Sequence, residues 1–163
     1  MIEQETMVQV CVFEPGAIYN RRREIHAHYG GQRQGGISTP KSAPLIFLFT
    51  GESGDQFGYR DGPREDGTFA YCGEGQLGDM GFVRGNLAIR DHIASGRDLL
   101  LFEKLRRVGF YRFLGYFTCV GFEYQTGLDR AGNSRRVIIF HLRPTIGGEA
   151  PELQEAVSRL SAL

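Results

Sequence analysis

The apolar residues of this chain fall into short runs that glycine, proline and polar turn residues separate. Residues 7–13 alternate apolar and polar side chains with the period of a half-buried strand. Residues 44–50 instead form a continuous apolar run, which is typical of a strand buried on both faces. The same reasoning predicts three more strands, over residues 98–102, 110–124 and 136–142.

Two further segments have a helical period. In residues 80–96 four apolar side chains recur at roughly helical spacing, although Gly85 lies among them: Phe82, Leu87, Ile89 and Ile93. The tail over about 151–162 opens with a proline and spaces its apolar residues four and three apart, so we expect an amphipathic helix there. In residues 19–37 two glycine pairs, at 30–31 and 35–36, instead favour a loop with polar tips.

These elements predict an α+β fold, a curved mixed β-sheet or barrel with flanking helices. The chain has 163 residues, enough for one domain with a sizeable core, and we expect a single domain over 1–163 with its core at about 7–144. The sequence shows neither a secretion leader nor an apolar run near the length of a membrane helix. We therefore expect a cytoplasmic, nucleoid-associated protein with no membrane partner.

Charge is balanced overall but not locally. The sequence has 19 basic and 19 acidic residues, so attraction to nucleic acid would have to rest on a local asymmetry. Between residues 19 and 41, five basic side chains face Glu24 alone, a local balance of plus four: Arg21, Arg22, Arg23, Arg33 and Lys41. These five are the candidate contacts to a DNA backbone.

The cysteines and histidines do not predict a metal site. Cys11, Cys72 and Cys119 are odd in number and form no C-x-x-C pair, which indicates free thiols in a reducing compartment. His26 and His28 lie two apart without a third ligand nearby, so we expect structural or surface histidines. No metal or cofactor is predicted.

Residues 57–75 carry the richest candidate chemistry. Tyr59 and Tyr71 stand twelve residues apart across a turn that also holds three carboxylates, Asp61, Glu65 and Asp66. Aromatic faces can clamp a planar ring, a carboxylate can accept from an exocyclic amine, and glycines let the backbone approach the ring edge. A nucleobase pocket fits this pattern, and so does a hairpin whose aromatic residues pack into a core.

The order of these segments resembles the SET- and RING-associated (SRA) domain of the PUA-like superfamily, over residues 16 to about 144. The matching pieces are GGI (35–37), the strand ending at 50–51, the acidic turn (59–67), FAYCGEG (69–75) and GNLAI (85–89). The resemblance implies a bacterial, stand-alone reader of double-stranded DNA. It would bind 5-methylcytosine or another modified cytosine by flipping the base out of the duplex.

The resemblance also implies roles for single residues. Tyr59 and Tyr71 would sandwich the flipped base, and Asp61 would accept from its amine. The family commonly has a second aspartate where this chain has Gly62, so either Asp61 makes the contact to the amine or backbone groups with Glu65 or Asp66 read that edge, and we favour Asp61. The base pocket would thus comprise Tyr59, Asp61, Gly62, Tyr71, Cys72 and Gly73. The loop of Gln32, Arg33 and Gln34 would enter the DNA groove and fill the vacated space, and the short link 75–81 suggests weak reading of sequence context.

Four functions remain open at this stage. The leading one is a reader without chemistry of its own, since the sequence shows no metal-binding nuclease motif. The reader could also be the recognition component of a modification-dependent restriction system that works with a separate nuclease partner. An enzyme acting on a nucleobase would use Cys72 as nucleophile beside Asp61 or Glu74, but no activating base is visible near it. The fourth is an RNA-binding PUA-like module.

Overall fold

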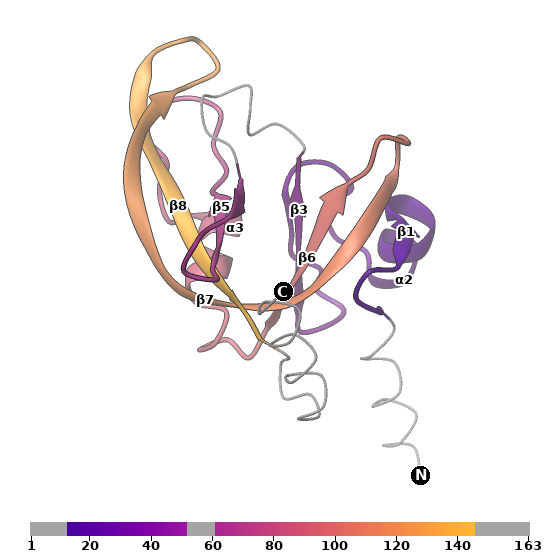
Figure 1. Ribbon diagram of the computed structural model, residues 1–163. Helices are drawn as coiled ribbons and strands as arrows, with labels where there is room; N and C mark the ends of the chain where they lie inside the picture. Colours follow the sequence, from indigo (N-terminus) through magenta and orange to yellow (C-terminus); the bar gives the residue numbers. More distant parts are fainter. Residues whose placement is uncertain (1–12, 52–60, 146–163) are drawn as a thin grey trace.

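A computed structural model describes residues 13–51 and 61–145 of the chain. They form one curved, mixed sheet, which is open rather than closed into a barrel (Figure 1). Its strands are β1 (Ile18–Asn20), β2 (Ile37–Ser38), β3 (Leu45–Thr50), β4 (Gly62–Pro63), β5 (Phe69–Cys72), β6 (Asp98–Lys104), β7 (Phe110–Leu128) and β8 (Ser134–Pro144). They run in the order β2-β3-β6-β7-β8-β5-β4, with β1 paired to β7. Together with short helices, this sheet confirms the predicted α+β class.

The four apolar runs from residue 44 onward are strands, as predicted. β3 pairs in parallel with β6, and β7 and β8 form a long antiparallel hairpin. The hairpin bends at an irregularity between Cys119 and Gly121, and its two strands sweep around one side of the molecule (Figure 1). The strand predicted over 7–13 and the helix predicted over 151–162 lie outside the described residues, apart from Phe13, which is not in a strand.

The prediction of a loop over residues 19–37 is wrong for its first half. A π-helical segment η1 (Arg21–His26) runs directly into the short helix α2 (Ala27–Tyr29). Asn20 accepts a hydrogen bond from the Arg23 N–H, and the Glu24 carboxylate accepts one from the Asn20 N–H. This reciprocal cap satisfies donors at the helix start, and it outweighs the turn tendency of the glycines that follow. Residues 30–36 have no regular element, as expected.

The helix expected over residues 80–96 is shorter than predicted. It is α3 (Arg84–Arg90), in which Ile89 is fully buried. Leu87 and Ile93 were assigned to the same apolar face, but they are 37% and 66% exposed. The fourth predicted face residue, Phe82, lies before the helix and packs partly against the core. The spacing rule therefore found the helix but not the side that it buries.

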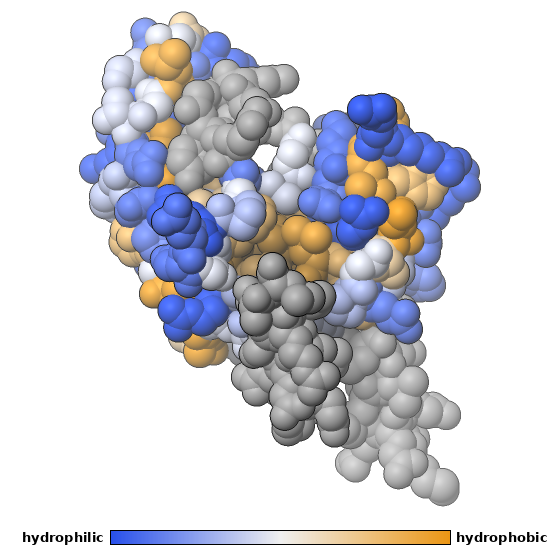
Figure 2. Space-filling model, viewed as in Figure 1, coloured by the Kyte–Doolittle hydropathy of each residue, from blue (hydrophilic) through white to orange (hydrophobic). Residues whose placement is uncertain are grey.

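Two apolar clusters lie on opposite faces of the central strands β3 and β6. Ile46, Leu48 and Leu99 point into the first cluster, which β5 and β8 complete. Phe47 and Phe49 point into the second, which is largely aromatic and is flanked by η1 and α2. Every residue of β3 is buried for this reason, as its unbroken apolar run predicted. On the face shown in Figure 2, hydrophilic residues cover the flanks and hydrophobic residues show in the middle.

Candidate nucleic-acid interface

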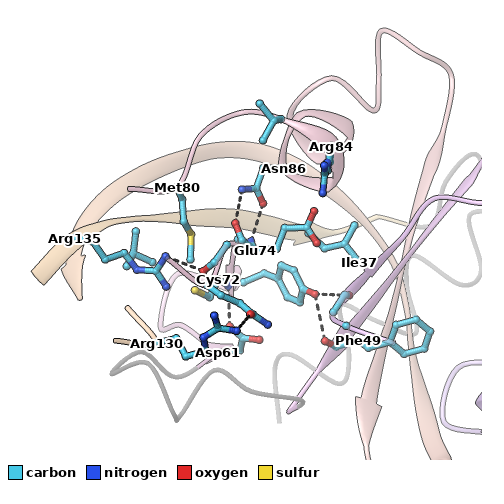
Figure 3. Close-up of a pocket in the computed structure, with 18 residues that line it drawn as sticks. Ile37, Phe49, Asp61, Cys72, Glu74, Met80, Arg84, Asn86, Arg130 and Arg135 are labelled. Atoms are coloured by element: carbon cyan, nitrogen blue, oxygen red, sulfur yellow. Dashed lines mark hydrogen bonds between the residues drawn. The ribbon is translucent and has the colours of Figure 1, made fainter. Parts of the chain in front are cut away.

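A cavity of about 960 Å³ opens on the side of the first cluster. Its walls come from the residues before and within β2, the end of β5 with the segment after it, the start of α3, and the β7–β8 hairpin (Figure 3). Four glycines line it: Gly35, Gly36, Gly73 and Gly75. Pockets of this size hold small organic ligands, and a nucleoside is within that range.

Tyr71 forms part of the cavity wall but is only 2% exposed. Its hydroxyl lies 2.6 Å from the Gly36 carbonyl oxygen and 3.2 Å from that of Phe49. A Cβ at Gly36 would stand 2.8 Å from the same hydroxyl, so glycine is required there. Burial raises the pKa of Tyr71 well above its ordinary value, and the hydroxyl therefore stays a donor. Tyr71 thus ties β5 to the loop that precedes β2.

Asp61 stands at the junction of three segments of the wall. Its Oδ2 accepts from the Thr50 hydroxyl at 2.7 Å, and its Oδ1 accepts from the Cys72 N–H at 2.8 Å. These two bonds fix the orientation of the carboxylate at the cavity wall. Asp61 lines the cavity, whereas Glu65 and Asp66 do not. The structure therefore brings the predicted carboxylate, and neither alternative, to the cavity.

Asn86 and Glu74 hold the far end of the β5 wall in place. The Asn86 side chain accepts from the Glu74 N–H and donates to the Glu74 and Gly81 carbonyls. The Glu74 carboxylate in turn accepts from the Gly85 N–H, and burial raises its pKa. A Cβ at Gly85 would stand 2.6 Å from the Glu74 Oε2. The Gly85-Asn86 pair is therefore a clamp on the pocket backbone, and Figure 3 shows the hydrogen bonds between Asn86 and Glu74.

The tip of the β7–β8 hairpin closes another side of the cavity. The Asp129 carboxylate accepts from the Gly78 N–H, and the Arg130 backbone and side chain both donate to Gln76. Arg135 follows in β8, where its Nη1 donates to the carbonyls of Gly75 and Gly78. The turn between β7 and β8 therefore forms part of the cavity wall and fixes the link that follows β5.

Cys72 lies on the cavity wall as an un-ionised thiol. Burial, reinforced by the neighbouring Asp61, raises its pKa to about 12, while Arg135 acts in the opposite direction. A thiol with this pKa carries almost no thiolate at neutral pH, and the thiolate is the nucleophilic form. Its environment is therefore opposite to the one that a cysteine nucleophile requires. Cys72 and Cys119 are both free of disulfides.

The remaining predicted pocket residues have different placements. Gly73 lines the cavity beside Cys72 and donates its N–H to the Ile138 carbonyl. Gly62 lies in β4, paired with Ala70, and does not line the cavity. Tyr59 lies outside the described residues, so its place opposite Tyr71 stays a prediction.

The prediction that Arg21 contacts phosphate needs correction, because this side chain is only 4% exposed. Its guanidinium stacks 3.7 Å from the centre of the Phe49 ring, and it donates to His26 Nε2 and to the Gln32 carbonyl. Arg21 therefore belongs to the interior beneath η1. The other members of the basic cluster are exposed: Arg22, Arg23, Arg33 and Lys41.

The predicted groove loop runs directly to the cavity rim. Gln32 anchors its base, since its side-chain oxygen accepts from the Thr39 N–H at 2.7 Å. Arg33 and Gln34 follow on the exposed surface, and Gly35 lines the cavity. The loop tip and the cavity are thus adjacent, as an inserting loop beside a base pocket requires.

His26 has a structural environment. Because the Arg21 guanidinium can only donate, His26 Nε2 accepts at 2.9 Å and Nδ1–H donates to the Gly30 carbonyl at 2.7 Å. Burial lowers the pKa of this ring. Within residues 13–51 and 61–145, no three His, Cys, Asp or Glu side chains gather as a metal site would require. No helix in the same ranges is long and apolar enough to cross a membrane.

Sequence reasoning missed the part that Thr50, Asn86 and Arg135 play in shaping the cavity, and it considered Glu74 only as a neighbour of a Cys72 nucleophile. The Gly85-Asn86 pair was noticed only as part of a resemblance, although a buried Asn that follows a glycine is a usual backbone clamp. Arg135 gave no sequence signal, because an arginine next to a turn is ordinarily solvated. Its role depends on the docking of the hairpin tip, which involves residues about 60 positions away.

Comparison with known proteins agrees with this geometry. The model of the ScoMcrA-like SRA domain matches residues 15–161. The sulfur binding domain and SRA domain of ScoMcrA, complexed with phosphorothioated DNA, align with 29% identity and a TM-score of 0.65. That alignment covers 89% of this chain and 45% of the ScoMcrA chain. No curated protein matches the chain.

Two other solved structures extend the comparison. The type IV phosphorothioation-dependent restriction endonuclease ScoMcrA aligns with the same identity and TM-score over 89% of this chain, but only 31% of the endonuclease chain is covered. The SRA domain of SUVH5, in complex with fully methylated CG DNA, aligns at 21% identity and a TM-score of 0.60, over 83% of this chain and 91% of that one, and shows the fold alone. The chain belongs to the ScoMcrA-like SRA domain family.

Proposed function

We propose that this protein reads modified cytosine in double-stranded DNA by taking the flipped base into the cavity beside Asp61. The observation that carries the proposal is the placement of the Asp61 carboxylate on a cavity wall lined by glycines, in a chain of the SRA family. The carboxylate would accept from the exocyclic amine of cytosine, and the glycines would admit the ring edge. Neighbouring structures of this fold hold phosphorothioated or methylated DNA.

The free energy gained by stacking the flipped base can offset the cost of extruding it, without any covalent chemistry. Extruding a base costs a few kcal/mol, and stacking on an aromatic side chain returns about 1 to 3 kcal/mol. Tyr71 would supply one aromatic surface and Tyr59 the other, while Arg33 or Gln34 would enter the vacated stack. A buried methyl group adds only about 0.8 kcal/mol, roughly a fourfold preference. Discrimination by methylation alone is therefore expected to be modest.

A binding titration with one duplex sequence tests this function. The duplex is prepared unmodified, methylated at cytosine on one strand, methylated on both strands, and phosphorothioated without methylation. We expect the methylated forms to bind at least about fourfold more tightly than the unmodified form. Equal affinity for all four forms would contradict modification reading, and a preference for the phosphorothioated form alone would reassign the modification.

A second candidate function is the recognition component of a restriction system that acts with a separate nuclease. The similarity to part of a restriction endonuclease favours it. Co-purification of a nuclease with the tagged full chain, and cleavage of modified but not unmodified DNA by the mixture, is the expected result. Purification of the chain alone from cells that contain modified DNA would speak against this function and leave the reader function in place.

A further inference from the structure

Arg135 carries two buried donors for which residues 13–51 and 61–145 provide no acceptor. The side chain is 5% exposed, and its Nη1 bonds to the carbonyls of Gly75 and Gly78 at 2.8 and 3.1 Å. Its Nε and Nη2 are buried and have no hydrogen-bond partner. Arg135 also lines the cavity and lies close enough to Cys72 to affect the thiol (Figure 3). The unpaired donors therefore lie at the wall of the candidate site.

A structural role accounts for only one of the three guanidinium nitrogens of Arg135, the Nη1 atom. Nη1 alone ties the hairpin to the segment after β5, and a guanidinium cannot give up its charge to avoid burial. Donors that are buried without a partner are unfavourable and rare in proteins, and more so when the group is charged. An arrangement of this kind is accounted for if a ligand supplies the missing acceptors.

The geometry of the free donors restricts the ligand. Nε–H and Nη2–H lie on one edge of the planar guanidinium and form a fork that matches two oxygens of a carboxylate or a phosphate. The carboxylates that line the cavity are already engaged elsewhere, Asp61 by Thr50 and the Cys72 N–H, and Glu74 by the Gly85 N–H. Arg84 and Arg130 also line the cavity and add positive charge to it. The site therefore favours an anionic group that the ligand brings.

We propose that the cavity contains an oxyanion subsite, in which the Nε–Nη2 edge of Arg135 receives two oxygens of the bound nucleotide. The oxygens belong either to a carboxylate substituent on the flipped base or to the adjacent phosphate. This inference rests on the proposed function for the statement that the ligand is DNA. Both nitrogens are covered in the ligand-free chain, so binding involves a local side-chain movement, for which the unbranched Met80 on the same wall is suited.

The test compares Arg135→Lys with Arg143→Lys, an exposed arginine of the same strand. Lysine can still donate to the Gly75 and Gly78 carbonyls but lacks the fork. Each protein is titrated with one duplex that carries 5-methylcytosine or 5-carboxylcytosine at the same position. If the base supplies the oxygens, Arg135→Lys weakens binding of the carboxylated duplex roughly ten- to a hundredfold and leaves the methylated duplex unchanged. If the phosphate supplies them, both duplexes lose equally, whereas Arg143→Lys affects neither.

A second measurement keeps the inference testable if Arg135→Lys folds poorly. Arg135→Gln, which also retains a donor for the two carbonyls, is melted beside the wild type in sodium phosphate and in sodium chloride of equal ionic strength. Phosphate is expected to raise the melting temperature of the wild type and not that of the variant. Unchanged binding of both duplexes by the variants, or wild-type melting that is identical in the two salts, would overturn the subsite. A wild type that is stabilised by phosphate but binds modified and unmodified DNA equally would overturn the reader function alone.

Discussion

Two buried arginines on opposite faces of the central strands have opposite surroundings. Arg21, on the side of the aromatic cluster, donates to His26 and to the Gln32 carbonyl and stacks on Phe49. Arg135, on the side of the cavity, bonds through Nη1, and its other two nitrogens have no partner within the described part of the chain. The two side chains are equally buried, at 4% and 5% exposure. The two arginines therefore do not differ in burial, but they differ in how many of their donors are hydrogen-bonded.

The same contrast extends to the regions around them. On the aromatic side, η1 and α2 flank the cluster of phenylalanines, and the buried Arg21 and His26 side chains are hydrogen-bonded within the chain. On the cavity side, the wall consists of backbone and glycines that Asn86, Asp61 and Tyr71 hold in position. One side is a closed core, and the other is a preorganised surface. The following experiments probe that difference.

The largest expected effect concerns Cys72 on the cavity side. Its pKa of about 12, against an ordinary value of 9.0, leaves about a thousandfold less thiolate than an ordinary cysteine has at pH 8. We expect iodoacetamide to label Cys72 in the folded protein far more slowly than in urea, as followed by mass spectrometry. Because the pKa is raised, the labelling rate of the folded protein should keep rising with pH above 9, where labelling of an ordinary cysteine levels off. Rapid labelling at pH 8 with loss of an activity would instead support an enzyme.

Replacing Arg21 tests whether the aromatic side of the sheet is a structural core. Arg21→Met removes two charge-assisted hydrogen bonds and the stacking on Phe49, and we expect it to lower the free energy of unfolding by about 3 kcal/mol. Urea denaturation measures this loss, and the relative affinity for modified and unmodified DNA should not change. Arg22→Met is the control, since that side chain is exposed and should leave stability within about 0.5 kcal/mol. An unchanged unfolding midpoint with weaker DNA binding would restore Arg21 as a phosphate contact.

Removing the Tyr71 hydroxyl tests the hydrogen bond that connects β5 to the loop before β2. Tyr71→Phe keeps the ring but leaves the Gly36 carbonyl without this donor, so we expect a loss of about 1 to 2 kcal/mol in stability. Affinity for modified DNA should fall as well, because the loop that carries Arg33 loses its anchor. Tyr124→Phe, whose ring is 49% exposed, is the matched control and should change neither quantity. If Tyr71→Phe and Tyr124→Phe have the same stability and the same DNA affinity, the Tyr71 hydroxyl does not hold the cavity wall in place.

The exposed basic residues should produce the smallest and least specific effect. Each phosphate contact changes the slope of log affinity against log salt by about 0.9, so Arg23→Ala should make the slope shallower by about one. The loss should be equal for modified and unmodified duplexes, because phosphate contacts carry no base information. Arg33→Ala differs: beside the cavity rim, it should weaken mainly the modified complex. Unchanged discrimination in Arg33→Ala would contradict the inserting loop.

The sequence predicted those parts of the fold that depend on local periodicity. The unbroken apolar run of β3 and the alternating β7 were recognisable because their side chains report directly on which faces are buried. The η1 helix was missed because its start depends on a reciprocal cap between Asn20 and Glu24, which two glycine pairs obscured. Leu87 and Ile93 were misassigned because helical spacing does not say which side of a short helix meets the core.

The candidate site was predictable where its residues are adjacent in sequence. Asp61, Tyr71 and Cys72 belong to one hairpin, and the structure places all three at the cavity. Arg21 was misplaced because a run of arginines does not reveal which member turns inward. Arg135 could not be foreseen, since its position depends on a hairpin that packs against a segment about 60 residues away. Long-range docking of this kind leaves no local pattern.

The most direct test of the central claim is the affinity of Asp61→Asn for modified and unmodified forms of one duplex, with Asp66→Asn as the control. Asparagine can still accept from the Cys72 N–H, but it removes the charged acceptor for the cytosine amine. The lost hydrogen bond is worth about 1.5 to 3 kcal/mol, more than the roughly fourfold preference for methylation, so we expect Asp61→Asn to bind the modified duplex no more tightly than the unmodified one. Asp66 bonds only to Thr68 in the adjacent turn, so its replacement should leave both affinities unchanged. Equal losses on the two duplexes, or a larger loss in Asp66→Asn, would contradict a base pocket at Asp61.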